Sequence, residues 1–128
     1  MASLGVVKAG DEPDSLITLM SNHPKETLVK MRTLLEQMVK CSCDKLGCPP
    51  AVASSDLLDK IKWLQQQNAV KNTVVDSMHS VRIEGNNAAH GKLDIADPTK
   101  TVLATALHFI QVVEWFIGCH SSEEKTIA

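Results

Sequence analysis

The sequence predicts an all-α protein, an antiparallel bundle of about four helices plus a short N-terminal helix. Apolar residues recur with the 3.6-residue period of amphipathic helices, and no segment shows the sustained alternation of a strand. Tyrosine is absent and aromatic residues make up only 3% of the 128 residues, whereas strands are enriched in aromatic side chains. The connecting loops are mostly short, which favours antiparallel neighbours.

The chain is long enough for one domain, which we place at residues 14–120. Residues 1–13 carry two glycines and a proline and are predicted to be a flexible leader. Residues 121–128 are mostly polar and are predicted to be a flexible tail. One or two helical turns are expected after the leader, from the apolar cluster Leu16, Ile17, Leu19 and Met20.

The first long helix is predicted to begin at Pro24, because proline suits the first helical turn, and to run to Leu46. The sequence Gly47-Cys48-Pro49-Pro50 is expected to end it. Its apolar positions have helical spacing: Leu28, Met31, Leu35 and Met38, flanked by Leu34 and Val39.

Polar capping residues precede the next two helices. Ser54-Ser55-Asp56 is expected to cap a helix that carries Leu57, Leu58, Ile61 and Leu64. Asn72 is expected to cap a third helix, which Gly91 and residues 94–98 end. The predicted core positions of the third helix are Val74 (with Val75), Met78, Val81, Gly85 and Ala88.

Asp97-Pro98 is expected to open a fourth helix that is apolar over a wide arc. One stripe contains Leu103, Ala106, Ile110, Val113 and Ile117, and a second contains Val102, Phe109 and Phe116. Such a helix is predicted to pack on more than one neighbour or on a second subunit, which favours a homodimer.

Composition excludes some classes of protein. A net charge of −2 argues against a protein that coats nucleic acid electrostatically. No uninterrupted apolar run approaches the ~18 residues of a membrane span, and the first residues lack the apolar region of a secretory signal. We therefore expect a cytoplasmic protein with no membrane partner.

The cysteines Cys41, Cys43 and Cys48 invite a zinc interpretation, with a fourth ligand from His23, Cys119 or His120. Structural zinc sites commonly use C-x2-C pairs, and this spacing departs from that pattern. Free thiols packed as small apolar groups are the favoured alternative, and no metal or cofactor is predicted.

Residues 81–91 hold the candidate site. Arg82, Asn86 and His90 stand four residues apart and so share one helix face. Gly85, costly inside a helix, suggests the close approach of another backbone or a ligand. Two interpretations are possible. The first is a tight helix crossing in which polar neighbours satisfy a buried histidine. The second is a functional site formed by these three residues.

A second polar pair, Arg32 and Glu36, lies beside the apolar stripe of the first long helix. If the first and third helices pack together, Glu36 is placed to accept a hydrogen bond from His90 or to pair with Arg82. We therefore predict a polar network that joins these residues.

The run Arg82-x-x-Gly85-Asn86-x-Ala88-Ala89-His90 resembles the signature of a domain of unknown function in the HEPN superfamily of helical bundles. Arg32 and Glu36 resemble that family's first long helix, and the resemblance covers roughly residues 22–118. It implies a bundle, often dimeric, found in type I restriction motor subunits, phage defence and toxin–antitoxin systems, or as a stand-alone protein.

Active HEPN members are metal-independent endoribonucleases whose motif places an arginine where this chain has Gly85. The favoured hypothesis is therefore a non-catalytic, homodimeric interaction module with a protein partner in a restriction or defence system, and RNA is not the favoured ligand. The alternative is an endoribonuclease in which His90 moves protons, Arg82 binds phosphate and Asn86 positions either group.

Overall fold

The computed structural model describes residues 23–92 and 97–127, with side chains through Cys119. Within those residues it contains five helices and no strand: α2 (Pro24–Lys45), α3 (Pro50–Ala53), α4 (Leu57–Gln66), α5 (Asn72–Ala89) and α6 (Pro98–Ile127). The predicted all-α bundle is therefore confirmed. The leader 1–13 and the short helix predicted after it lie outside the described residues.

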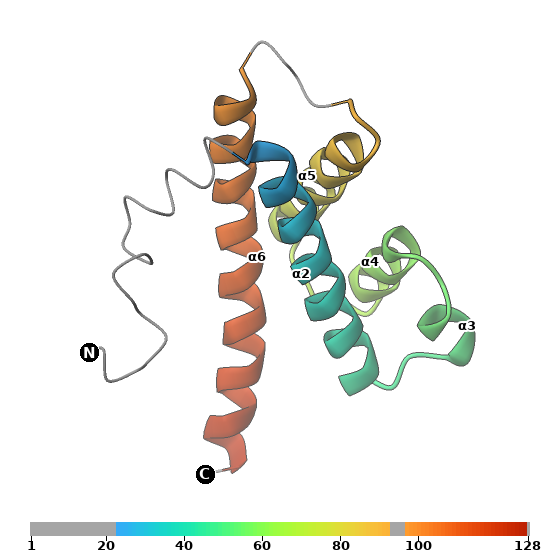
Figure 1. Cartoon of the computed structure of the whole chain (residues 1–128). Helices are drawn as coiled ribbons and strands as arrows, with labels where there is room; N and C mark the ends of the chain where they lie inside the picture. The colour runs from blue at the N-terminus through green and yellow to red at the C-terminus, as the bar shows by residue number, and fades with distance from the viewer. Residues whose placement is uncertain (1–22, 93–96, 128) are drawn as a thin grey trace, which may run out of the picture.

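Helix α2 is the centre of the bundle and contacts each of the other four helices. Helices α4 and α6 make no contact with one another and lie on opposite sides of the α2–α5 pair (Figure 1). The longest element, α6, packs on α2 and α5 along one side and has no neighbour on its outer side among the described residues.

Two of the predicted helix starts are made by aspartate caps. The side chain of Asp56 accepts a hydrogen bond from the backbone N–H of Asp59 at 2.9 Å, and Asp97 accepts one from Lys100 at 3.0 Å. The prediction for Asn72 is wrong: it is the first residue of α5, and its side chain accepts a hydrogen bond from Gln65.

Glycines end α2 and α5, as predicted. Gly47 and Gly91 have φ values of 72° and 71°, in the left-handed region that glycine adopts without steric cost. In both cases the N–H groups of the glycine and of the residue after it donate hydrogen bonds to carbonyl oxygens in the last turn of the helix, which is the Schellman arrangement.

The core lies between α2, α4, α5 and one side of α6. Leu28, Leu35 and Val39 of α2 are fully buried, as are Met78 and Val81 of α5. On α5 the buried first-turn residue is Val75, while Val74 is half-buried. The helical periodicity therefore identified the inward faces of α2 and α5, with one-residue errors at the start of α5 and at Met38 of α2, which is half-buried while Val39 is buried.

Helix α6 departs from the prediction in two ways. It continues through Ile127, so the expected tail from Ser121 is helical as far as that residue, and no proline or glycine follows Gly118 to end it. Its core side is Val102, Thr105 and Val112, whereas most of the first predicted stripe is exposed to solvent.

By length and composition, α6 over Pro98–Cys119 is also long and apolar enough to cross a membrane, and only 17% of this apolar stretch is buried. The sequence shows no uninterrupted apolar run here, because His108, Gln111 and Glu114 lie within the segment. The core helices of soluble proteins, which are mostly buried, have the same length and apolar composition. This property of α6 is therefore weak evidence for a membrane span.

Candidate functional site

The candidate site lies where α5 crosses α2, and Gly85 makes that crossing possible. A Cβ atom at Gly85 would lie 2.5 Å from the Cβ of Arg32 and 3.1 Å from its Cγ and Cδ. Real Cβ atoms do not approach so closely, so any larger residue would push the helices apart. The predicted close approach at Gly85 is thus made by the Arg32 side chain.

Arg32 also binds the residue next to Gly85. Its Nη1 donates a hydrogen bond of 2.6 Å to the side-chain oxygen of Asn86, which ties the middle of α2 to the last turns of α5. Glu36, one turn along α2, has its Oε1 3.8 Å from the Nε of Arg32, with 48% of the Glu36 side chain exposed. At that distance the ion pair is weak and strongly screened by solvent.

The predicted contact between Glu36 and His90 is not formed among the described residues. Helix α5 ends at Ala89, so His90 occupies the capping position beyond the helix and is exposed. Arg32 instead links the two helices: its Nη1 donates a hydrogen bond to Asn86 of α5, while its Nε has no hydrogen-bond partner in the described part of the chain and is 3.8 Å from Glu36. Sequence spacing predicted correctly that the two helices pack together, but it did not show that Arg32, and not Glu36, makes the polar contact with α5.

Arg82 and His79, which lie three residues apart on α5, are both half-buried. The Nε of Arg82 and the Nδ1 of His79 are both buried with no hydrogen-bond partner among the described residues. Burial lowers the pKa of His79 from 6.5, and the positive charge of Arg82 lowers it further. His79 is therefore neutral near pH 7.

His79 is a residue that the sequence analysis missed. The available signal was its position three residues before Arg82, which places both on one helix face. The structure does not join Arg82 to Asn86 or His90 by a hydrogen bond or ion pair within the described residues. The three residues of this face therefore have different surroundings. Asn86 is bound by Arg32, whereas Arg82 is half-buried and His90 lies in solvent.

The cysteines do not converge with other ligands in the part of the chain that the structure describes, where no group of three or more His, Cys, Asp or Glu residues could hold a metal ion. Cys43 is fully buried, and burial followed by the neighbouring Cys48 raises its pKa to about 11. Cys41 is exposed. Cys43 thus packs as a small apolar side chain, the favoured alternative of the sequence analysis.

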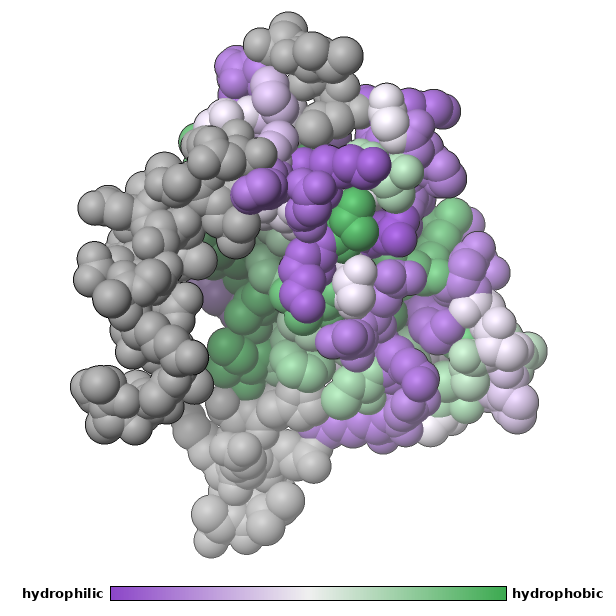
Figure 2. All heavy atoms as spheres, in the orientation of Figure 1, coloured by the Kyte–Doolittle hydropathy of each residue, from purple (hydrophilic) through white to green (hydrophobic). Residues whose placement is uncertain are grey.

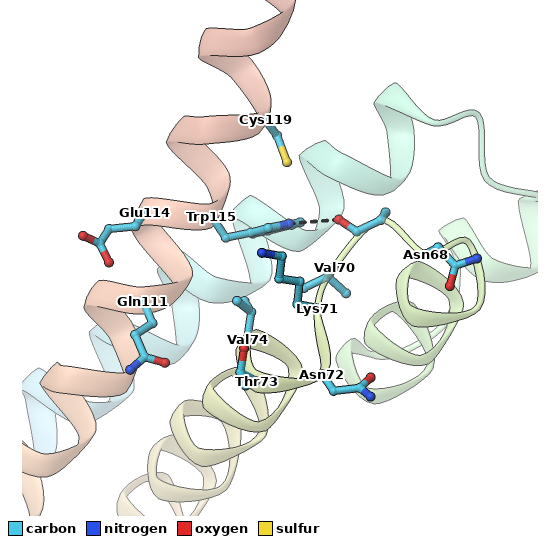
Figure 3. Close-up of a pocket in the computed structure, with 11 residues that line it drawn as sticks. Asn68, Val70, Lys71, Asn72, Thr73, Val74, Gln111, Glu114, Trp115 and Cys119 are labelled. Atoms are coloured by element: carbon cyan, nitrogen blue, oxygen red, sulfur yellow. Dashed lines mark hydrogen bonds between the residues drawn. The ribbon is translucent and has the colours of Figure 1, made fainter.

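A second polar region surrounds Trp115 at the opposite end of α5 (Figure 3). Its cavity of about 990 Å³ is lined by the α4–α5 loop, the start of α5 and one side of α6. The indole Nε1 of Trp115 donates a 3.0 Å hydrogen bond to the carbonyl oxygen of Ala69, and Lys71 extends toward the indole ring. This hydrogen bond fastens the α4–α5 loop to α6, which α4 itself does not touch.

The chemistry that an arginine at the α2–α5 crossing can offer is the binding of an anion, and the Nη1 of Arg32 is already engaged by Asn86. Arginine holds phosphate and carboxylate groups through its planar set of donors. Acid–base catalysis requires a proton-transfer group within hydrogen-bond reach of the reacting atom, with partners that orient it. His90 has no such partner among the described residues.

Sequence comparison identifies the family. The profile of a domain of unknown function, DUF4145, matches residues 14–122, so the chain belongs to that family. Neither the curated proteins nor the solved structures include a match to the chain.

Proposed function

We propose that this DUF4145 protein is a non-catalytic helical interaction module that forms a homodimer through the outer face of α6. The observation that carries this proposal is a stripe of large apolar side chains in solvent. Leu103, Leu107, Ile110 and Ile117 are 48%, 67%, 52% and 56% exposed. Figure 2 shows apolar surface along the middle of α6, beside α2.

The stripe has the spacing of a helix-pairing surface. Leu103, Ile110 and Ile117 are seven residues apart, and a second row of the same period contains Lys100, Leu107 and Glu114. Two such rows, offset by three or four residues, are the core positions of a coiled coil. From Leu103 to Ile117 the stripe extends over about 21 Å of helix.

The charges in the second row favour a second copy of this chain in antiparallel orientation. Lys100 and Glu114 are both exposed and lie on either side of Leu107. In a parallel pair each would face its own copy, which places like charges together. In an antiparallel pair centred on Leu107 and Ile110, each lysine lies within one turn of the partner's glutamate, and the two-fold axis of a closed dimer is satisfied.

Light scattering coupled to size exclusion tests the proposal. At micromolar concentration the wild type is expected to have the mass of a dimer and Ile110→Glu that of a monomer. The matched control is Ile83→Glu, because Ile83 of α5 is also partly exposed, at 44%. A monomeric wild type contradicts the proposal. A wild type that binds lipid vesicles through this face, and does not dimerise through it, also contradicts the proposal.

A charge exchange tests the orientation. Lys100→Glu and Glu114→Lys each place like charges near one another and are expected to weaken the dimer. The double variant restores opposite charges and is expected to recover the dimer. A double variant weaker than both single variants would exclude the antiparallel arrangement.

The proposed setting is a cytoplasmic nucleic-acid-processing or phage-defence system, with the module as an accessory that binds a protein partner. Its support is the resemblance of residues 82–90 to the HEPN signature. Three features favour a non-catalytic role: glycine stands at the usual arginine position, Asn86 is bound by Arg32, and His90 has no orienting partner among the described residues.

One observation favours the second candidate, a metal-independent endoribonuclease. His90 is exposed at the end of α5 and is accessible to a substrate. In that reaction the 2′-OH of RNA attacks the adjacent phosphorus, the bond from phosphorus to the 5′-oxygen of the next nucleotide breaks, and a 2′,3′-cyclic phosphate is left. His90 would take the proton of the 2′-OH and return a proton to the leaving 5′-oxygen, and Arg82 would bind the charged phosphate.

A cleavage assay in excess chelator separates the two candidates. Wild type, His90→Ala and the control His23→Ala, which replaces another exposed histidine, are compared on generic RNA. Equal background in all three is expected. Cleavage that is lost only in His90→Ala would overturn the non-catalytic proposal.

A further inference from the structure

Two cysteines stand on either side of the turn that ends α2. Cys43 belongs to the last turn of the helix, and Cys48 follows Gly47, whose φ of 72° reverses the chain. The backbone N–H of Cys48 donates a hydrogen bond of 3.1 Å to the carbonyl oxygen of Cys43. In a Schellman turn the side chains at these two positions commonly pack against one another.

The turn brings the two cysteines within the range of a disulfide bond. Because only short backbone bonds lie on either side of the 3.1 Å hydrogen bond, their Cα atoms are at most about 7 Å apart. Disulfides join residues whose Cα atoms are about 4.4–6.8 Å apart. The side chains meet as well: burial raises the pKa of Cys43 to about 11, and the next largest cause is the Cys48 thiol, which also forms a side-chain hydrogen bond with it. The two thiols are therefore neighbours.

The two thiols differ in their access to solvent. Cys43 is fully buried, and its Sγ lies 3.9 Å from the carbonyl oxygen of Lys60 in α4. Cys48 is half-buried and packs against the edge of the core. Cys41 is exposed, and its position two residues before Cys43 turns it about 200° around the helix, away from the pair. Cys48 is therefore the thiol of this pair that a reagent reaches first, and Cys43 is held beside it.

We propose that Cys43 and Cys48 form a reversible disulfide and are a redox modification site of the domain, with a small-molecule disulfide (RSSR) as the oxidant. The Cys48 thiolate attacks one sulfur of RSSR, the S–S bond breaks, and the first RS⁻ leaves and takes up the proton that Cys48 released. Cys43 then loses its proton and attacks the Sγ of Cys48. The internal disulfide forms, and the second RS⁻ leaves and takes up the proton of Cys43. The two cysteines lose two electrons, and RSSR is reduced to two RSH.

The disulfide ties the start of the loop that leads from α2 to α3 to the last turn of α2 (Figure 1). In compartments that keep most thiols reduced, disulfides of this transient kind serve catalysis or redox sensing. Cys43 bonds to α4, and α4 does not contact α6. The modification site is therefore separate from the proposed dimer face and does not depend on it.

Equilibration of the full chain with reduced and oxidised glutathione tests the proposal. Trypsin cleaves after Lys40, Lys45 and Lys60, so the disulfide joins residues 41–45 to residues 46–60, and mass spectrometry detects the joined peptides. They are expected from the wild type and from the matched controls Cys41→Ser and Cys119→Ser, and not from Cys48→Ser. Joined peptides that disappear in Cys41→Ser would overturn the proposal, because they assign the bond to Cys41. A wild type that carries only glutathione on Cys48 would overturn it as well.

A comparison of the folded and unfolded chain tests whether the turn itself holds the pair together. In the Cys41→Ser protein, the equilibrium constant for disulfide formation by oxidised glutathione is expected to be at least about tenfold higher under native conditions than in concentrated urea, because the fold raises the effective concentration of one thiol at the other. By linkage, the oxidised protein is then expected to have a higher Tm than the reduced protein. An equal or smaller constant in the native protein, or a lower Tm after oxidation, contradicts the proposal.

Discussion

Replacing Gly85 by alanine tests whether the crossing of α2 and α5 depends on the missing side chain. The new Cβ would lie 2.5 Å from the Cβ of Arg32, whereas carbon atoms in contact are about 3.5–4.0 Å apart. Rotation of the Arg32 side chain does not relieve this clash, because its Cβ is fixed by the backbone of α2. The helices must therefore separate by about 1 Å, the shortfall from that contact distance.

Two effects oppose one another in this variant. Alanine is favoured over glycine inside a helix by about 1 kcal/mol. Overpacking costs about 1–3 kcal/mol, and weakening the bond from the Arg32 guanidinium to Asn86 adds about 1–2 kcal/mol. We expect a net loss of about 2 kcal/mol of unfolding free energy, which lowers the Tm by roughly 10 °C for a domain of this size.

This change in unfolding free energy is measured by urea unfolding, with the loss of helix monitored by circular dichroism. Gly118→Ala is the matched control, because a Cβ at Gly118 of α6 meets no atom within 4 Å. The control is expected to raise the stability by up to about 1 kcal/mol through helix propensity alone. If Gly85→Ala is as stable as the wild type, the close crossing described here is wrong.

Three other changes have expected outcomes. The pKa of His79 is lowered in the folded protein, so its side chain takes up a proton near pH 6.5 only when the protein unfolds. The unfolding free energy should therefore fall as the pH drops below 6.5, and it should fall less steeply in His79→Gln. Equal slopes in the two proteins between pH 7 and 5 contradict this. Iodoacetamide at pH 8 should modify exposed Cys41 and not Cys43, whose pKa is about 11, until the protein unfolds, and peptide mapping detects either result. Asp56→Ala removes the α4 cap and should cost about 1 kcal/mol in urea unfolding; an unchanged midpoint would show that the cap is dispensable.

The sequence was sufficient wherever the cause of a structural feature is local. An aspartate before a helix accepts the free N–H groups of the first turn, so Asp56 and Asp97 predicted the starts of α4 and α6. Glycine adopts positive φ without steric cost, so Gly47 and Gly91 predicted the ends of α2 and α5. Asn72 misled because its oxygen binds Gln65, a neighbour that no local rule specifies.

Only the tertiary structure decided which polar groups of the candidate site meet. Helical periodicity indicates that residues share a face, but it gives neither the crossing angle of two helices nor the reach of a side chain. Arg32 therefore binds Asn86, His90 is left in solvent, and the Nδ1 of half-buried His79 is buried without a described partner. In the same way, the apolar arc of α6 was evident from the sequence, but which part of it lies in the core depends on where α2 and α5 pack, and this leaves Leu103, Leu107, Ile110 and Ile117 in solvent.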